Sequence, residues 1–520
     1  MTAAAPWTSS VAPAPAADGP PPVRLRRLGV EVGGAVAYLR RDGPAARVMG
    51  ATPGSRVIVR WGGREATVTL GIVGDEWLAC DTLGLSDRAW ALLGSPPAGT
   101  WGACAHAAPA ASLGAMRSKV YGARLDDAAY DAIVGDVAAE RYSDLELAAF
   151  VTACAGGRMD AGETVALTRA MLAVGDRLVW PRERVLDKHC VGGLPGNRTS
   201  LIVVPIAAAC GLLLPKTSSR AITSPAGTAD TMATLAPVEL DLATMRRVVD
   251  REGACIVWGG AMRLSPADDV IIRAERPLDL DSEGQLVASV LSKKAAAGST
   301  HVVIDVPVGP TAKVRTTAAA DALAARLLTV GHALGLTLHV LRTDGTQPVG
   351  DGIGPALEAR DVLAVLQGAP NAPPDLRARA LLLAAAVLEL GGAAPLGDGV
   401  ALAESVLADG RAWRKFQAIA EAQGGLRAPP CAPHRREVTA PAAGIVRAID
   451  NRRLARVAKL AGAPDAPDAG VDLHVRVGTA VDAGAPLYTI HAAASGQLAY
   501  AAAYAAAQAG VVDVAADAAA

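Results

Sequence analysis

The chain has little lysine and few aromatic residues. Among its 520 residues, Phe, Trp and Tyr make up 3%, and only eight of the 50 lysine and arginine residues are lysine. Lysine carries a compact point charge and arginine a planar fork, so a site that needs an ammonium group cannot use arginine instead. Five of the eight lysines fall between residues 188 and 313. Either this is chance, or a site in that region requires them.

The chain has no excess of either charge and no long apolar run. The formal net charge is -1, which argues against a nucleic-acid-binding protein. The longest apolar runs, Leu201–Pro215 and Ala380–Leu390, are shorter than the roughly 20 residues of a membrane span. Residues 1–22 lack the charged start and apolar stretch of a secretory signal, so we expect a flexible Ala/Pro-rich tail there.

The seven cysteines are scattered, and no two of them form a Cys-x-x-Cys pair. This spacing favours reduced thiols over a disulfide framework or a zinc site. We therefore expect a cytoplasmic protein with no metal site and no membrane association.

The hydrophobic pattern predicts an α/β multidomain protein, because a chain of this length exceeds what one core supports. Residues 23–100 contain short alternating runs separated by glycine turns, which predict a small N-terminal β domain. Residues 115–180 contain helix-start signals, namely a capping box at Ser143–Glu146 and a second helix start at Asp160–Glu163, and predict a helical domain.

In residues 181–422, strand-like runs alternate with helical patterns, which predicts a mostly parallel α/β domain. Residues 201–207 (LIVVPIA) are interpreted as one of these strands. Ligands of such sheets bind at the carboxyl ends of the strands. In residues 423–520 the strand pattern returns and ends in an Ala-rich stretch, which predicts a C-terminal α+β domain.

Two polar loops flank the apolar run Leu201–Pro215. The first reads DKHCVGGLPGNRTS (187–200) and the second KTSSRAITSPAGTADTM (216–232). Hydroxyl groups, cations and glycine backbone N–H groups are the usual phosphate ligands in proteins. The loops therefore predict a phosphate site, although such residues also build turns and helix caps.

Two other anion or metal motifs do not fit the first loop. Three residues separate Gly192 from Gly196, and Arg198 stands where a Walker A loop has lysine. His189 and Cys190 have no spaced partners for a metal site. For His189, a catalytic role and a scaffold role as a hydrogen-bonding residue both remain open.

The two loops together resemble the thymidine phosphorylase family of pentosyltransferases. The stretches SDLELAAF, GGAMRLSPADDVIIRAE, LVASVLSKK and DGTQPVGDGIGPALEARDVL extend the resemblance over nearly the whole chain. It is closest to the longer branch, which comprises archaeal AMP phosphorylases and bacterial relatives usually called thymidine phosphorylases.

The resemblance implies phosphorolysis, in which inorganic phosphate attacks C1′ of the sugar and expels the base. Phosphate would be a co-substrate, no cofactor would be needed, and the protein would be a homodimer or larger homo-oligomer. Phosphate would be held by Lys188, Gly193, Ser219 and Thr228, and catalysis would involve Lys188, His189 and the proton donor Asp281. The implied substrate-binding residues are Gly193, Ser219, Arg220, Ala221, Ile222, Thr223, Ser224, Thr228, Arg273, Ser289, Lys293 and Lys313.

The substrate implied by the resemblance depends on the branch. Cys190 and the length of the first loop follow the AMP phosphorylase pattern, whereas the preference for arginine is typical of a GC-rich bacterial gene, whose relatives carry the thymidine name. We expect a thymidine-phosphorylase-type activity. The alternatives are the same chemistry on a nucleoside 5′-monophosphate (AMP, CMP or UMP, giving ribose 1,5-bisphosphate), a Mg²⁺-dependent phosphoribosyltransferase, and a non-catalytic nucleotide-binding protein.

Overall fold

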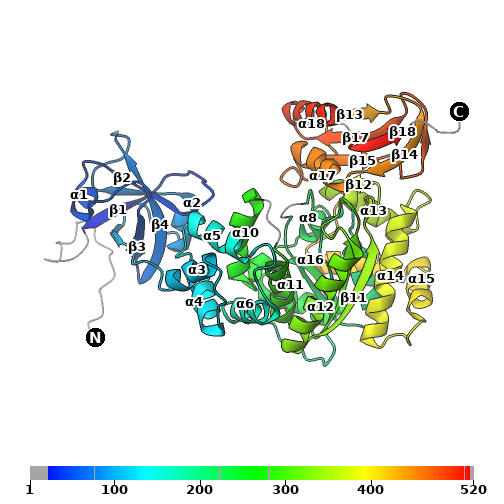
Figure 1. Cartoon of the computed structure of the whole chain (residues 1–520), viewed down its shortest axis with the longest axis horizontal. Coiled ribbons are helices and arrows are strands. Elements are labelled where there is room, and N and C mark those ends of the chain that lie inside the picture. Colours follow the sequence, from blue (N-terminus) through cyan, green and yellow to red (C-terminus); the bar gives the residue numbers. More distant parts are fainter. Residues whose placement is uncertain (1–20, 75, 222–223, 279–281, 509, 516–520) are drawn as a thin grey trace. The chain divides into compact units, whose positions relative to one another are not determined.

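The computed structural model describes residues 21–74, 76–221, 224–278, 282–508 and 510–515. The predicted tail at residues 1–22 therefore lies outside the described residues, except for its last two. The chain forms two compact units, which are described one at a time (Figure 1). Unit 1 contains Met1–Arg117 and Asp136–Ala149, and unit 2 contains Ser118–Gly135 and Phe150–Ala520.

Unit 1 contains a closed barrel with the strand order β1-β5-β2-β4-β3-β6, which confirms the predicted N-terminal β domain. Strands β3 and β4 form a hairpin in which Trp61 pairs with Arg64. The two residues between them, Gly62 and Gly63, have φ of 56° and 78°, as the tight primed hairpin turns require. The elements are β1 Pro22–Arg27, β2 Val36–Arg40, α1 Pro44–Met49, β3 Arg56–Trp61, β4 Arg64–Val73, β5 Thr82–Leu85, α2 Asp87–Leu92 and β6 Trp101–His106.

A helical region follows, in which the predicted capping box at Ser143 forms and the predicted helix start at Asp160 has a capping box as well. The Ser143 N–H donates to Glu146 Oε2 (2.7 Å), and the Glu146 N–H donates to Ser143 Oγ (3.3 Å). Asp160 and Glu163 make the same reciprocal pair, at 2.8 and 3.3 Å. The helices are α3 Leu113–Val120, α4 Asp127–Ala138, α5 Asp144–Cys154 and α6 Ala161–Ala173.

Two parallel sheets form the α/β part of unit 2, with the strand orders β11-β10-β7 and β8-β9. The Leu186 N–H donates to the carbonyl of Leu213 (2.8 Å) and so links the two sheets. The parallel α/β prediction is confirmed. The strands are β7 Leu186–Cys190, β8 Leu214–Ser218, β9 Ala254–Trp258, β10 His301–Val308 and β11 Thr337–Asp344.

Helices surround these sheets, and none among the described residues is long and apolar enough to cross a membrane. They are α7 Ser200–Ala209, α8 Thr228–Ala233, α9 Leu242–Glu252, the short 3₁₀ helix Gly259–Met262, α10 Pro266–Leu278, α11 Glu283–Ala296, α12 Thr317–Ala333, α13 Pro355–Gln367, α14 Pro374–Gly391, α15 Gly399–Ala408 and α16 Arg411–Gln423.

The interpretation of residues 201–207 as a strand is wrong, because this run lies inside helix α7. Residues Ser200–Ala208 are all buried, so the helix has no polar face, and periodicity cannot distinguish such a short run from a buried strand. β-Branched residues and Pro205, which lacks an N–H, also weaken the helical signal. Packing on all sides outweighs these local preferences.

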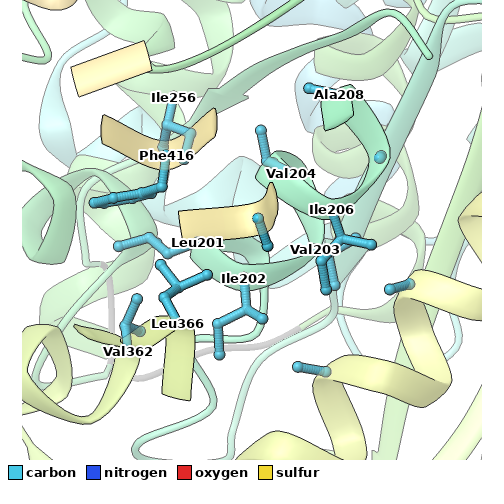
Figure 2. Packing of buried hydrophobic residues seen from close by; sticks show 14 of the residues in the cluster. Leu201, Ile202, Val203, Val204, Ile206, Ala208, Ile256, Val362, Leu366 and Phe416 are labelled. Carbon is cyan, nitrogen blue, oxygen red and sulfur yellow. The ribbon is translucent and has the colours of Figure 1, made fainter. Parts of the chain in front are cut away.

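Helix α7 lies within the large hydrophobic core of unit 2 (Figure 2). Its side chains belong to one buried cluster with Ile256 of β9, Val362 and Leu366 of α13 and Phe416 of α16. The core therefore fixes the helix that follows the first polar loop, and so determines where that loop ends.

The C-terminal part of unit 2 contains two small antiparallel sheets, ordered β12-β15-β17-β13 and β16-β14-β18, which with two helices confirm an α+β arrangement. Strand β12 comes from the glycine-rich loop after β11, and its Gly352 pairs with Asp472 of β15. The remaining elements are β12 Gly352–Ile353, β13 His434–Thr439, β14 Gly444–Ile449, α17 Asn451–Leu460, β15 Gly470–Leu473, β16 Ala480–Val481, β17 Pro486–Ala492, α18 Ser495–Ala507 and β18 Val512–Ala515.

The substitution Phe416→Ala should destabilise unit 2. Phe416 is fully buried against α7, and such a truncation leaves a cavity that costs about 3–5 kcal/mol. Denaturant unfolding followed by circular dichroism should show the loss. The matched control is Leu382→Ala on α14, where the side chain is 45% exposed; equal shifts in the two variants would contradict the packing described here.

Candidate active site

A cavity opens at the carboxyl ends of β7 and β8. It is lined by the ends of these strands, by the loops that follow them, by Lys313 after β10, and by one face of helix α11. Parallel strands bring their carboxyl ends to one edge, which is where ligands of such sheets bind. The cavity therefore occupies the position that the sequence pattern predicts.

Most of the predicted site residues line this one cavity. Arg273, on α10, is not among the described lining residues, and Ile222, Thr223 and Asp281 lie outside the described residues. The predicted residues that line it are Lys188, His189, Gly193, Ser219, Arg220, Ala221, Ser224, Thr228, Ser289, Lys293 and Lys313.

Lys188, on β7, is fully buried at this cavity. Its ammonium group donates to Thr199 Oγ1 (2.6 Å) and lies 3.9 Å from a carboxylate oxygen of Asp305 on β10. Asp305 also accepts from Asn197 Nδ2 (3.0 Å) and Thr343 Oγ1 (2.6 Å). These bonds hold the Lys188 cation in one place.

Asp187, the preceding residue, binds two further lysines. Its carboxylate accepts from Lys216 on β8 (3.0 Å) and from Lys294 on α11 (2.6 Å). All three side chains are buried. Although burial alone would raise it, the two lysines lower the pKa of Asp187, so the carboxylate is ionised at neutral pH.

The buried network formed by Asp187, Lys188, Lys216, Lys294 and Asp305 contains three lysine amino groups and two carboxyl groups. Burial lowers the pKa of Lys188, and it lowers the pKa of Lys294 to about 7, although neighbouring carboxylates favour the charged form of each lysine. An anion in the cavity would supply the missing negative charge and favour protonated lysines. The network therefore suits an anionic ligand.

Arg198 is balanced by its own buried carboxylate. Its guanidinium group forms an ion pair with Glu358 at the start of α13, and its Nη1 donates to Thr228 Oγ1 (3.4 Å). Glu358 also accepts from Thr231 Oγ1 (3.1 Å). Arg198 thus connects the two polar loops without adding net charge.

The second loop is held closed by Asp230. One carboxylate oxygen accepts from the backbone N–H groups of Ala221 (2.6 Å) and Gly227 (2.9 Å). A Cβ at Gly227 would lie 2.8 Å from the Ala221 nitrogen, so only glycine allows the two ends of the loop to meet. The loop therefore presents Ser219 and Thr228 from a fixed frame.

The first loop depends on glycine at two positions. Gly193 (φ 77°) would place a Cβ 2.4 Å from the Lys313 Cβ, and Gly196 (φ 74°) would place one 2.0 Å from the carbonyl oxygen of Val349. Any larger residue would displace Lys313 or the glycine-rich loop after β11.

Two titratable groups at the cavity are neutral at neutral pH. Burial, helped by Lys294 and Lys216, lowers the pKa of His189 well below its usual value. Burial raises the pKa of Cys190 to about 12. The Cys190 thiol therefore acts as a hydrogen-bonding group, accepting from Asn197 Nδ2 (3.3 Å) and the Gly192 N–H (3.4 Å).

Several supporting residues, namely Asp305, Glu358 and Lys294, are missing from the predicted site, whereas Asp187 and Lys216 belong to the two predicted loops. The carboxylates give no sequence signal, because burial of a single acidic residue cannot be recognised from a local pattern. The lysines do give one, since all five lysines between residues 188 and 313 either line the cavity or bind Asp187.

Three family models match the chain. Residues 182–413 match the glycosyl transferase family a/b domain, residues 114–175 match the helical bundle domain of that family, and residues 445–511 match the pyrimidine nucleoside phosphorylase C-terminal domain.

Full-length relatives are also similar. The "putative thymidine phosphorylase 1" of Acidovorax sp. (strain JS42) is 66% identical over 466 residues, covering 90% of this chain and 91% of the relative. A "putative thymidine phosphorylase" of Polaromonas sp. (strain JS666 / ATCC BAA-500) is 62% identical over 500 residues, covering 96% and 98%. The chain belongs to the thymidine phosphorylase family. It is a pentosyltransferase, and the cavity lies in the family's α/β domain.

Native Cys190 of this family member should resist alkylation at pH 8. The thiolate is the reactive form, and a pKa of about 12 leaves roughly one thiolate in 10,000 thiols. Iodoacetamide followed by peptide mass spectrometry should show modification at the exposed Cys80 and Cys431 before Cys190. Denatured protein, in which Cys190 should react, is the control; equal rates for Cys190 and Cys431 in native protein would contradict the assignment.

Proposed function

We propose that this protein cleaves the glycosidic bond of a pyrimidine nucleoside by phosphorolysis, converting thymidine and phosphate to thymine and 2-deoxyribose 1-phosphate. The observation that carries the proposal is the buried network beneath the cavity, in which three lysines accompany two carboxylates. The names of the similar relatives support the choice of nucleoside.

Phosphate is proposed to bind above this network, held by Lys188, Gly193, Ser219 and Thr228. One of its oxygens attacks C1′ as the bond from C1′ to the base breaks, and the base leaves with the electron pair. Positive charge develops on the sugar in such a transition state, so an anion fixed next to C1′ stabilises it. The bonds from Thr199 and Asp305 to Lys188 would pre-organise this arrangement.

The base is proposed to lie against α11, where Ser289 and Lys293 line the cavity. Lys293 donates to Asp268 (2.6 Å), which orients its ammonium group. For Arg273 and Asp281, the proposed roles in base binding and in proton donation, respectively, rest on the resemblance to the family alone. A neutral His189 would serve as a hydrogen-bonding residue.

The same chemistry on a nucleoside 5′-monophosphate is the second candidate. Lys313 lines the cavity, with its backbone and Cβ close to Gly193, and a lysine at this position would suit a second phosphate group. We further propose that the enzyme needs no cofactor, is cytoplasmic with its cysteines reduced, and forms a homo-oligomer.

A substrate panel tests the proposal. We expect phosphate-dependent release of free base from thymidine, with slower release from AMP, CMP or UMP at equal concentrations, measured by chromatography. The control reactions contain neither phosphate nor arsenate, so that no nucleophile of this kind is present. Faster release from a nucleotide would favour the second candidate, and no release from any substrate would overturn phosphorolysis.

The substitution Lys188→Met should lower kcat by about 10²–10³-fold, since a fixed charge next to the nucleophile is removed. Steady-state kinetics with saturating thymidine would measure this. Lys415→Met is the matched control, because Lys415 pairs with Glu252 and is not a cavity residue. Near-normal turnover of a folded Lys188→Met enzyme would refute the role.

A further inference from the structure

The side chain of Gln285 is buried at the cavity without a hydrogen-bonding partner among the described residues. It is 4% exposed and lines the cavity, and neither its amide oxygen nor its amide nitrogen makes a hydrogen bond to a residue that the structure describes. An unsatisfied buried polar group is costly and uncommon. The unsatisfied amide at the cavity therefore indicates a group that hydrogen-bonds to a ligand.

A second buried glutamine shows the usual arrangement. Gln423 is 3% exposed, and its amide is fully used by backbone groups: its oxygen accepts from the Ile256 N–H (2.8 Å), and its nitrogen donates to the carbonyls of Pro237 (2.8 Å) and Ile256 (3.0 Å). The fold therefore satisfies a glutamine where the role is structural, and Gln285 differs from it.

Gln285 belongs to the stripe of polar residues on α11 that faces the cavity. Gln285, Ser289 and Lys293 are spaced four residues apart, so they lie on one face of the helix, and all three line the cavity. Ser289 and Lys293 are the residues proposed above to hold the base. Gln285 extends this stripe by one helical turn toward the N-terminus of α11.

The hydrogen-bonding groups of the amide indicate which part of the substrate it binds. A glutamine amide presents a donor and an acceptor side by side. A phosphate dianion offers only acceptors and would leave the amide oxygen unsatisfied. The N3–H of thymine or uracil lies next to a carbonyl group, so this edge satisfies both ends of the amide at once.

We propose that Gln285 is a specificity-determining residue that reads the N3–H and adjacent carbonyl of the pyrimidine base. The proposal rests on the phosphorolysis proposed above and deepens it by assigning a reader for the base. A site whose polar group is left unpaired by an analogue rejects that analogue strongly. The analogue to use here is the deoxyribonucleoside of 5-methylpyrimidin-2-one, which lacks both N3–H and the 4-oxo group.

The kinetic test compares wild type with Gln285→Leu on both nucleosides. We expect Gln285→Leu to lower kcat/KM for thymidine about 10- to 100-fold and to change kcat/KM for the analogue less than threefold. A merely structural residue would lower both values equally, and that result would overturn the proposal. Gln423→Leu is the matched control, and any loss of activity in it should be equal for the two nucleosides.

Stability gives an independent readout. Because the Gln285 amide has no partner to lose, the unfolding midpoint of ligand-free Gln285→Leu should equal or exceed that of wild type. Gln423→Leu should unfold at a lower denaturant concentration. A comparable loss in both variants would mean that Gln285 is used by the fold, and would overturn the proposal.

Calorimetric binding of free thymine in the presence of phosphate separates this inference from the proposed reaction. Thymine should bind Gln285→Leu about tenfold more weakly than wild type, whereas 1,5-dimethylpyrimidin-2-one, whose N1-methyl group leaves it no N–H next to the carbonyl, should bind the two proteins equally. If wild type and Gln285→Leu differ in thymine binding as expected but wild type turns over no thymidine, only the proposed reaction would be overturned. Turnover of thymidine by wild type without a change in discrimination in Gln285→Leu would overturn the role of Gln285 alone.

Discussion

The site depends on charges that the fold removes from water. Asp187 and Lys188 are neighbours on β7, and side chains of neighbouring strand residues point to opposite faces. One therefore binds Lys216 and Lys294, while the other approaches Thr199 and Asp305. A single strand thus supports two sets of buried charges. Their mutual contacts offset part of the cost of burial, and an anionic ligand would favour the protonated form of the lysines.

Contacts made by the two polar loops give the site its shape. Gly193 and Gly196 allow close backbone contacts that a side chain would block, and Asp230 joins the two ends of the second loop. Arg198 connects the loops to each other and to Glu358. Because the first loop is held by contacts outside itself and the second by Asp230 and Arg198, the hydroxyl groups of Ser219 and Thr228 would need little reorganisation to bind the proposed phosphate.

Much of this could be predicted from the sequence, because polar loops, capping boxes and glycine turns are local signals. The few lysines are also visible in the sequence itself, and they indicate positions where arginine cannot replace lysine. Residues 201–207 were misinterpreted because a helix buried on every side has no periodicity to detect. The roles of Asp187, Asp305 and Gln285 could not be predicted, because they depend on which distant residues surround each side chain.

The short strand β12 (Gly352–Ile353) connects the C-terminal region to the site. This strand pairs with β15 on one side, and its own loop contacts the turn at Gly196 on the other, where Val349 donates to the carbonyl of Pro195 (3.1 Å). Removing the C-terminal sheet would leave the edge of β12 unpaired, and the loop that carries β12 contacts the first polar loop. The C-terminal region therefore supports the first polar loop through β12, and a shortened chain ending near residue 422 would lose this support.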